Sequence, residues 1–152
     1  MKVKTLAEAN LKYGVIENKI WADEPKWMVL LKIPKEISVV ADYTTKIQTK
    51  IYLNKDIIDP LNQVFTNLIK NNLQKELKIF SGCFCIRDVR GFPGILSAHA
   101  YGLALDWRGS EMPLGANSLW TPEFVKTWKD IGWSWGGDFS RKDPMHFSYC
   151  WE

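Results

Sequence analysis

Histidine is scarce in this sequence, because its 152 residues include only His99 and His146. Any metal binding or acid–base catalysis that uses imidazole is therefore confined to these two positions. A serine or cysteine hydrolase would need one of them as its catalytic base. Neither a Gly-x-Ser-x-Gly elbow nor a comparable cysteine motif is present, which disfavours that class of enzyme.

Cysteine is also scarce, and two of the three cysteines, Cys83 and Cys85, are separated by a single residue. Neighbours this close rarely form a disulfide with each other, so a disulfide framework is not expected. On one face of a strand they could bind a soft metal, but packing as small apolar side chains is the commoner role. The cysteine content therefore predicts synthesis in a reducing compartment.

Long apolar runs are missing. The longest, residues 27–31, is far shorter than the roughly 20 residues that a membrane-spanning helix needs. Charged residues stand at the start of the chain, where a signal peptide needs its apolar stretch. No repeat, low-complexity tract or Pro/Gly/Ser-rich linker divides the sequence. We therefore expect residues 1–152 to form one domain, made in the cytoplasm and not inserted in a membrane.

A strong excess of one charge is absent as well. Twenty Lys and Arg against seventeen Asp and Glu leave a net charge of +3, too little for a dedicated nucleic-acid binder. The content of 46% apolar and 24% charged residues is that of a globular domain. A chain of this length can bury a full core without disulfides or metal. We expect a monomer with no nucleic-acid partner.

Hydrophobic spacing predicts helices grouped around short strands. Helical periodicity between capping residues predicts three helices, over residues 5–14, 59–77 and 121–132. Alternating or short apolar segments predict four strands, over residues 47–53, 79–86, 103–107 and 146–149. Because strands and helices do not alternate regularly, this order favours an α+β fold with a largely antiparallel sheet.

Both histidines lie in short motifs that also contain a carboxylate. His99 and Asp106 are seven positions apart, with Gly102 between them. A turn or bulge at this glycine would let both side chains reach one site. His146 follows Asp143 by three positions and could supply a third metal ligand. Two imidazoles, a carboxylate and a water are a usual catalytic zinc set, whereas two partly buried histidines without metal are the simpler alternative.

The order of these residues resembles the signatures of the zinc D-alanyl-D-alanine carboxypeptidase family. Ser97-x-His99-x-x-Gly102-x-Ala104-x-Asp106 resembles the first signature. The second signature, an acidic residue three positions before a histidine, is matched by the pair at 143 and 146.

Other segments resemble the phage-endolysin branch of this family, which includes L-alanyl-D-glutamate endopeptidases. They are Arg87-Asp88-Val89-Arg90-Gly91, Trp135-Gly136-Gly137-Asp138-Phe139 and Asp143-Pro144-Met145-His146-Phe147. The resemblance is strong from about residue 83 to 147. One departure is Trp107-Arg108-Gly109, where the family often has an apolar residue and asparagine after the zinc aspartate.

The resemblance implies a hedgehog/DD-peptidase-like fold, with helices packed on a small, largely antiparallel sheet and a Zn²⁺ site. It implies that His99, Asp106 and His146 are the zinc ligands and that Asp143 is the general base. Zinc would lower the pKa of a bound water to about 7, and a carboxylate in hydrogen-bond reach of that water would accept its proton.

The family also uses an upstream arginine to stabilise the anionic intermediate, a role for which a guanidinium is suited. Arg87 is the first candidate for this role and Arg90 the second. Ser97 and Trp135 are candidates for substrate binding. The alternatives are that Ser97 only shapes the turn before His99 and that Trp135 packs in the core.

The implied function is that of a zinc metallopeptidase acting on bacterial peptidoglycan stem peptides, as an endolysin-like L-alanyl-D-glutamate endopeptidase. A D-alanyl-D-alanine carboxypeptidase or dipeptidase is one alternative. Another is a non-catalytic zinc domain like that of hedgehog signalling proteins, although an acid at Asp143 favours an enzyme. We expect no separate cell-wall-binding module. We also expect the enzyme to reach the cell wall after its release from the cytoplasm.

Overall fold

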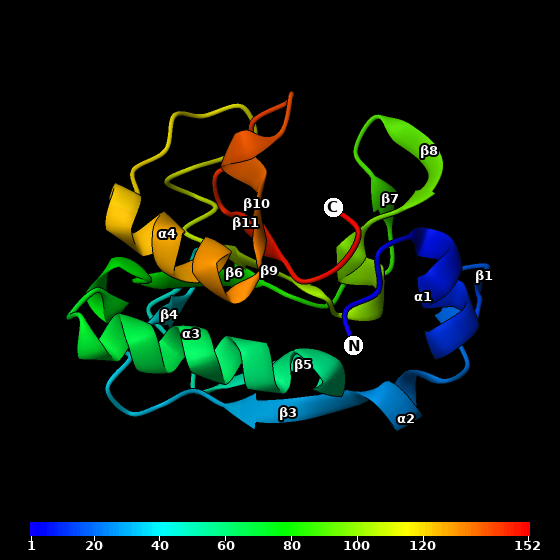
Figure 1. Ribbon diagram of the computed structural model, residues 1–152, viewed down its shortest axis with the longest axis horizontal. Helices are drawn as coiled ribbons and strands as arrows, with labels where there is room; N and C mark the ends of the chain where they lie inside the picture. Colours follow the sequence, from blue (N-terminus) through cyan, green and yellow to red (C-terminus); the bar gives the residue numbers. More distant parts are fainter.

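The computed structural model describes residues 1–152 as a mixed α+β fold built around one central sheet (Figure 1). The sheet has five strands in the order β10-β11-β9-β6-β4. Their bounds are Ser134–Trp135, His146–Ser148, Ala104–Trp107, Ile79–Gly82 and Val40–Ala41, respectively. Only the β4–β6 pair is parallel, while the other three pairs are antiparallel. The predicted α+β class with a largely antiparallel sheet is confirmed.

Three further pairs of strands flank the central sheet, and all are antiparallel. They are β1 with β2 (Ile16–Glu17, Ile20–Trp21), β3 with β5 (Met28–Lys32, Lys50–Asn54), and β7 with β8 (Asp88–Val89, Phe92–Leu96). The β7–β8 hairpin stands away from the central sheet in Figure 1, on the side where the C-terminal segment passes. This hairpin is therefore free to form one wall of a site beside the sheet.

The four α-helices are short. Their bounds are Leu6–Tyr13 (α1), Glu24–Trp27 (α2), Ile58–Lys70 (α3) and Pro122–Ile131 (α4). The predicted caps are confirmed at α1 and α4, where the hydroxyls of Thr5 and Thr121 accept N–H groups of the first turn. None of these helices combines the length and apolar character needed to cross a membrane.

Helix α3 differs from its predicted bounds at both ends. It begins at Ile58 rather than after Asp59, because a 3-10 turn at Lys55–Ile57, capped by the Asn54 side chain, leads directly into it. It ends at Lys70, so Leu77 is buried from a separate segment. Apolar spacing continues past the helix because the following turn packs on the same core.

Two predicted strands are shorter in the structure. The segment predicted from residue 79 to 86 pairs only to Gly82. Beyond it the chain leaves the sheet, and Cys85 donates its backbone N–H to the carbonyl of His99. The strand predicted over residues 47–53 is observed at Lys50–Asn54, and Ile47 forms only an isolated bridge. All three cysteines are free, and Cys85 is exposed while Cys83 is buried.

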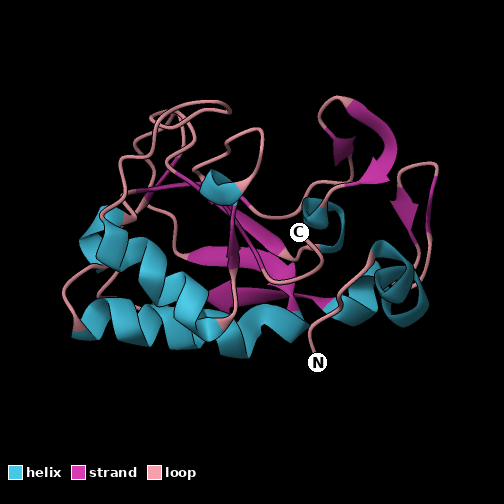
Figure 2. Ribbon diagram, turned by 45° about the horizontal axis from the view of Figure 1, so that its top comes forward, coloured by secondary structure: helices cyan, strands magenta, loops and turns pink.

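The core lies between the central sheet and the α3–α4 pair, which run side by side (Figure 2). Trp128 of α4 stacks on Phe147 of β11 with ring centroids 4.4 Å apart. Leu105 of β9 lies opposite Phe147 in the antiparallel β9–β11 pair and is fully buried. Because successive residues of a strand face opposite sides of the sheet, the neighbouring Asp106 and His146 point away from this core.

Candidate metal centre and substrate groove

Two of the predicted metal ligands face each other across adjacent strands. The antiparallel register of β9 and β11 places Asp106 directly opposite His146. Their side chains meet, with His146 Nδ1 3.1 Å from Asp106 Oδ1. Since both strands are anchored by buried aromatic residues, the two ligands are held on a rigid part of the sheet.

His99 reaches the same point from a 3-10 helix, η3 (Ala98–Tyr101), and not from a strand. The predicted glycine turn ends this helix, because Gly102 has a left-handed φ of 67° that suits glycine. A Cβ at this position would lie 2.7 Å from Met28 Sδ. The turn redirects the chain into β9 and brings His99 Nε2 to 3.2 Å from Asp106 Oδ2.

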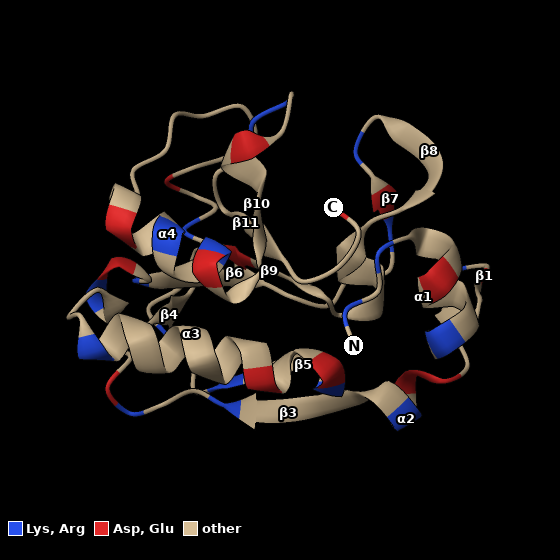
Figure 3. Cartoon of the chain, viewed as in Figure 1, with Lys and Arg blue, Asp and Glu red and all other residues tan.

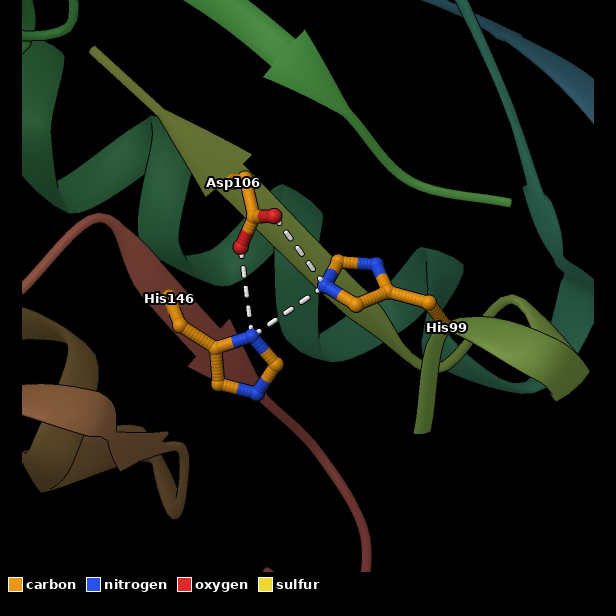
Figure 4. Close-up of side chains that lie close together, drawn as sticks. All are labelled: His99, Asp106 and His146. Atoms are coloured by element: carbon orange, nitrogen blue, oxygen red, sulfur yellow. Dashed lines mark hydrogen bonds and ion pairs between the residues drawn. The ribbon is translucent and has the colours of Figure 1, made fainter. Parts of the chain in front are cut away.

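The three side chains converge on one point (Figure 4). His99 Nε2 also lies 3.2 Å from His146 Nδ1. Two ligands bound 2.0–2.1 Å from a tetrahedral zinc ion lie about 3.3 Å apart, close to each of the three separations here. Two imidazoles and one carboxylate are also a set that zinc accepts in catalytic sites. The donor atoms of His99, Asp106 and His146 therefore fit a metal ion.

The far nitrogen of each imidazole has a defined acceptor, which fixes which nitrogen faces the cluster. His99 Nδ1 lies 2.6 Å from the carbonyl oxygen of Cys83. His146 Nε2 lies 2.5 Å from Glu152 Oε2. Sequence reasoning missed Glu152, because no motif or fixed spacing links it to either histidine.

The electrostatics of the cluster keep its carboxylate ionised. Burial alone would raise the pKa of Asp106, but the His99 and His146 imidazoles hold it well below its usual range. Burial would lower the pKa of His146, but the carboxylates of Asp106 and Glu152 raise it to about 10. An ionised Asp106 between two imidazoles provides the negative charge that a divalent cation needs.

Asp143 lies beside the cluster on the loop that precedes β11. Its N–H donates to the carbonyl of Gly136 at 2.9 Å, and a Cβ on Gly136 would lie only 2.2 Å from the Asp143 carbonyl oxygen. The glycine therefore permits this close approach. Asp143 Oδ1 is buried without a hydrogen-bond partner, and burial raises the pKa of this carboxyl. A buried, unpartnered oxygen is available to a water or a substrate group.

A cavity of about 310 Å³ opens directly beside the metal cluster. Its lining includes Asp106, Asp143 and His146, together with Arg87 and Arg90 of the β7–β8 hairpin region. A second cavity of about 510 Å³ shares Arg90 and Asp106 with the first. The two cavities therefore adjoin at Asp106, and together we call them the groove.

Residues 90–149 match the family model described as D-alanyl-D-alanine carboxypeptidase. The matched segment covers less than half of the chain and contains all three residues of the cluster, together with Asp143. No curated protein matches the sequence. The match supports the predicted peptidase family, and three residues within the matched segment, His99, Asp106 and His146, converge on a point that could hold a metal ion.

The two candidate arginines lie at different points of the groove. Arg87 directly precedes β7, where its guanidinium donates to the Asp88 carbonyl at 3.2 Å. Arg90 lies in the tight connection between β7 and β8 and lines both cavities. It is also close enough to Asp143 to offset a small part of the rise that burial causes in the pKa of that carboxyl. Both arginines thus line the cavity beside the cluster, and their catalytic role stays a prediction.

The two candidate substrate residues make contacts within the protein. The Ser97 hydroxyl accepts the backbone N–H of His99 at 3.3 Å, which shapes the start of η3, and Ser97 also lines the cavity. The Trp135 indole donates to the carbonyl of Pro144 at 2.9 Å and is not among the residues lining this cavity. Trp135 therefore supports the loop that carries Asp143, and its contact with substrate stays a prediction.

Proposed function

We propose that this protein is a zinc metallopeptidase that cleaves peptidoglycan stem peptides, as an endolysin-like L-alanyl-D-glutamate endopeptidase. One observation carries the proposal. The cavity beside the His99/Asp106/His146 cluster is also lined by Asp143, whose buried Oδ1 has no hydrogen-bond partner. The family match at residues 90–149 supports the same reading.

In this proposal the ligands and the base have separate tasks. His99 Nε2, His146 Nδ1 and the Asp106 carboxylate hold the metal. A bound zinc ion would polarise the scissile carbonyl and make a water acidic enough to act as a nucleophile near neutral pH. Asp143 takes the proton of the attacking water at Oδ1 and returns it to the leaving amine.

The arginines of the groove would stabilise the negative charge that develops on the scissile carbonyl oxygen. A guanidinium donates charge-assisted hydrogen bonds, which strengthen as an oxyanion forms. Arg87 and Arg90 both line the cavity next to the cluster. Since only a donor that meets the oxyanion accelerates the reaction, one of the two is expected to dominate.

We expect Arg87→Ala to lower turnover more than Arg90→Ala. Losing one donor to an oxyanion costs roughly 2.7–4 kcal/mol of transition-state stabilisation, or about 10²–10³-fold in turnover. Steady-state kinetics of both variants on one cell-wall substrate make the comparison. The opposite ranking would move this role to Arg90, and normal turnover in both variants would remove it from the pair.

The shape of the groove supports cleavage within a peptide. The two cavities adjoin at Asp106 and also share Arg90, so the groove extends beyond a single pocket at the cluster. A carboxypeptidase needs only a short pocket on the side of the leaving group. The alternative, removal of a terminal D-alanine, is therefore less well supported than endopeptidase cleavage.

The charge around the groove supports an anionic substrate. Basic segments occur on the β7–β8 connection and on the loop before β11 (Figure 3). On that loop, the Arg141 guanidinium donates to the carbonyl of Arg90 and lies 5.8 Å from the Phe92 ring centroid. Peptidoglycan stem peptides carry carboxylates, which such a wall would attract.

We further propose that residues 1–152 work as one peptidase domain and as a monomer on the cell wall. Support comes from a single buried cluster of 31 apolar residues, which extends from Val3 to Cys150 and leaves no internal division. No nucleic-acid partner is part of this proposal.

Digestion of purified peptidoglycan followed by mass spectrometry of the muropeptides tests the function. Cleavage after L-alanine should release stem peptides with a new amino terminus at D-glutamate. Loss of only terminal D-alanine would instead establish the carboxypeptidase alternative. Zinc-loaded protein that leaves muropeptides of several wall types intact would favour a binding domain without catalysis.

A further inference from the structure

Glu152 is a buried carboxylate that joins the two segments carrying the histidines. Its Oε2 lies 2.5 Å from Nε2 of His146 on β11. Its Oε1 accepts the backbone N–H of Ala98, at the start of η3, at 3.2 Å. The side chain is only 15% exposed. One carboxylate therefore connects the segment of His99 with that of His146.

The backbone of Glu152 is also fixed. The Ser134 hydroxyl of β10 donates to the Glu152 main-chain oxygen at 2.5 Å. Strand β10 in turn pairs with β11, where Ser134 is opposite Ser148. The same sheet therefore fixes both the Glu152 backbone and His146. The contact between the carboxylate and the imidazole is held by the fold.

An imidazole binds a metal only through a nitrogen that carries no proton. In His146, Nδ1 faces Asp106 and His99, while Nε2 faces Glu152. With a metal bound at Nδ1, the one remaining ring proton is on Nε2, where the Glu152 carboxylate can only accept it. The lone pair of Nδ1 is then directed at the cluster, as metal binding requires.

The two histidines are supported in different ways. His99 Nδ1 has a backbone carbonyl, that of Cys83, as its acceptor. His146 Nε2 relies on the side chain of Glu152. A backbone acceptor survives any substitution of its residue that keeps the fold, whereas a carboxylate can be removed by one substitution. His146 is therefore the ligand whose orientation depends on a single side chain.

We propose that Glu152 is a positioning residue, which holds the Nε2–H tautomer of His146 and thereby pre-organises the metal centre. The inference rests on the proposed metal centre, and although Glu152 also lines the first cavity, it assigns the role of Glu152 to its contact with His146. Partners of this kind typically change metal affinity by 10–100-fold when removed. It follows that removal of Glu152 should change metal affinity directly, through His146. Any change in turnover would result from the change in metal affinity.

The test is zinc affinity, measured by competition between the full-length protein and a chromophoric chelator. Glu152→Ala should weaken zinc binding by about 10–100-fold. Glu152→Gln should weaken it less, because its amide oxygen can still accept from Nε2–H but cannot also serve the Ala98 N–H. Glu123→Ala, which removes an exposed carboxylate from the first turn of α4, is the matched control and should leave the affinity unchanged.

A second readout follows the histidine ring itself. Because the chain contains only two histidines, a long-range ¹H–¹⁵N spectrum of the imidazoles is simple to assign. Zinc-loaded wild-type protein should show His146 protonated at Nε2 and His99 protonated at Nδ1. In Glu152→Ala the Nε2 proton of His146 should exchange faster with water, while the Nδ1 proton of His99 stays protected.

Unchanged zinc affinity and an unchanged Nε2 proton in folded Glu152→Ala would overturn the positioning role alone. If that variant does not fold, the isosteric Glu152→Gln decides by the same two measurements. Wild-type protein that binds no zinc would overturn the metal centre and, with it, this inference. The two failures are distinguishable because only the second is visible in the unsubstituted protein.

Discussion

Asp143→Asn is expected to lower turnover by about 10²–10⁴-fold, the range for loss of a general base, while zinc content stays near that of wild type. An amide has nearly the size of the carboxylate but cannot accept a proton from the attacking water. Its nearest constraint, the hydrogen bond from the Asp143 N–H to Gly136, involves only the backbone. Kinetics on cell-wall substrate and elemental analysis of the same preparation make the measurement.

The pH dependence of turnover provides a second measurement of the role of Asp143. Burial raises the pKa of Asp143, and the base works only when ionised, so activity should fall as the pH drops through this raised value. The acid limb of the profile should then disappear in Asp143→Asn. Wild-type turnover in that variant would end the proposed mechanism, whereas joint loss of zinc and activity would make Asp143 a ligand.

Asp143→Glu serves as the geometric control for the same residue. It keeps the carboxylate but adds one methylene, which moves the oxygens by about 1 Å. A displacement of this size can cost on the order of 10²-fold in rate, and the carbonyl of Gly136 leaves the backbone no room to compensate. We therefore expect little recovery. Full recovery would show that the position of this carboxylate is not critical.

The second large effect is expected at the histidines. His99→Ala or His146→Ala should abolish both zinc binding and activity, because each removes one of the two imidazole nitrogens that lie 3.2 Å apart and 3.1–3.2 Å from an oxygen of Asp106. The fold should survive, since a domain of this size has a full apolar core without metal. Elemental analysis, turnover and circular dichroism together measure the outcome.

Metal removal provides the matching experiment on the unsubstituted chain. A chelator should stop hydrolysis and leave the circular dichroism spectrum largely unchanged, and added zinc should restore turnover. Outright unfolding on chelation would identify a structural metal and weaken the catalytic proposal. Zinc that stays at wild-type content in His99→Ala and His146→Ala would contradict the ligand assignment.

Much of the metal cluster could be predicted from the sequence, because its determinants are local. Only two histidines are present, and Gly102 lies where a left-handed residue is needed between His99 and Asp106. The caps at Thr5 and Thr121 likewise act within one helical turn. Features of this kind depend on a few neighbouring residues, so sequence order is enough to reveal them.

Other features depend on segments that meet only in the folded chain. The end of β6 at Gly82 is set by the path toward η3, where Cys85 donates its backbone N–H to the carbonyl of His99. Asp143 Oδ1 is left without a partner only because the surrounding loops bury it. The groove beside Asp106 is lined by residues of the β7–β8 region and of the loops around the sheet, which are far apart in the sequence.

Glu152 shows most clearly which features follow from the sequence and which depend on the tertiary structure. By itself, the sequence determined which residues could bind a metal, because imidazole and carboxylate are metal ligands wherever they occur. Only the tertiary structure decided which nitrogen of each ring faces the centre. That choice depends on the Cys83 carbonyl and on a carboxylate that also bonds Ala98, 54 positions earlier. Hydrogen-bond partners over such separations are set by the fold, and no local pattern encodes them.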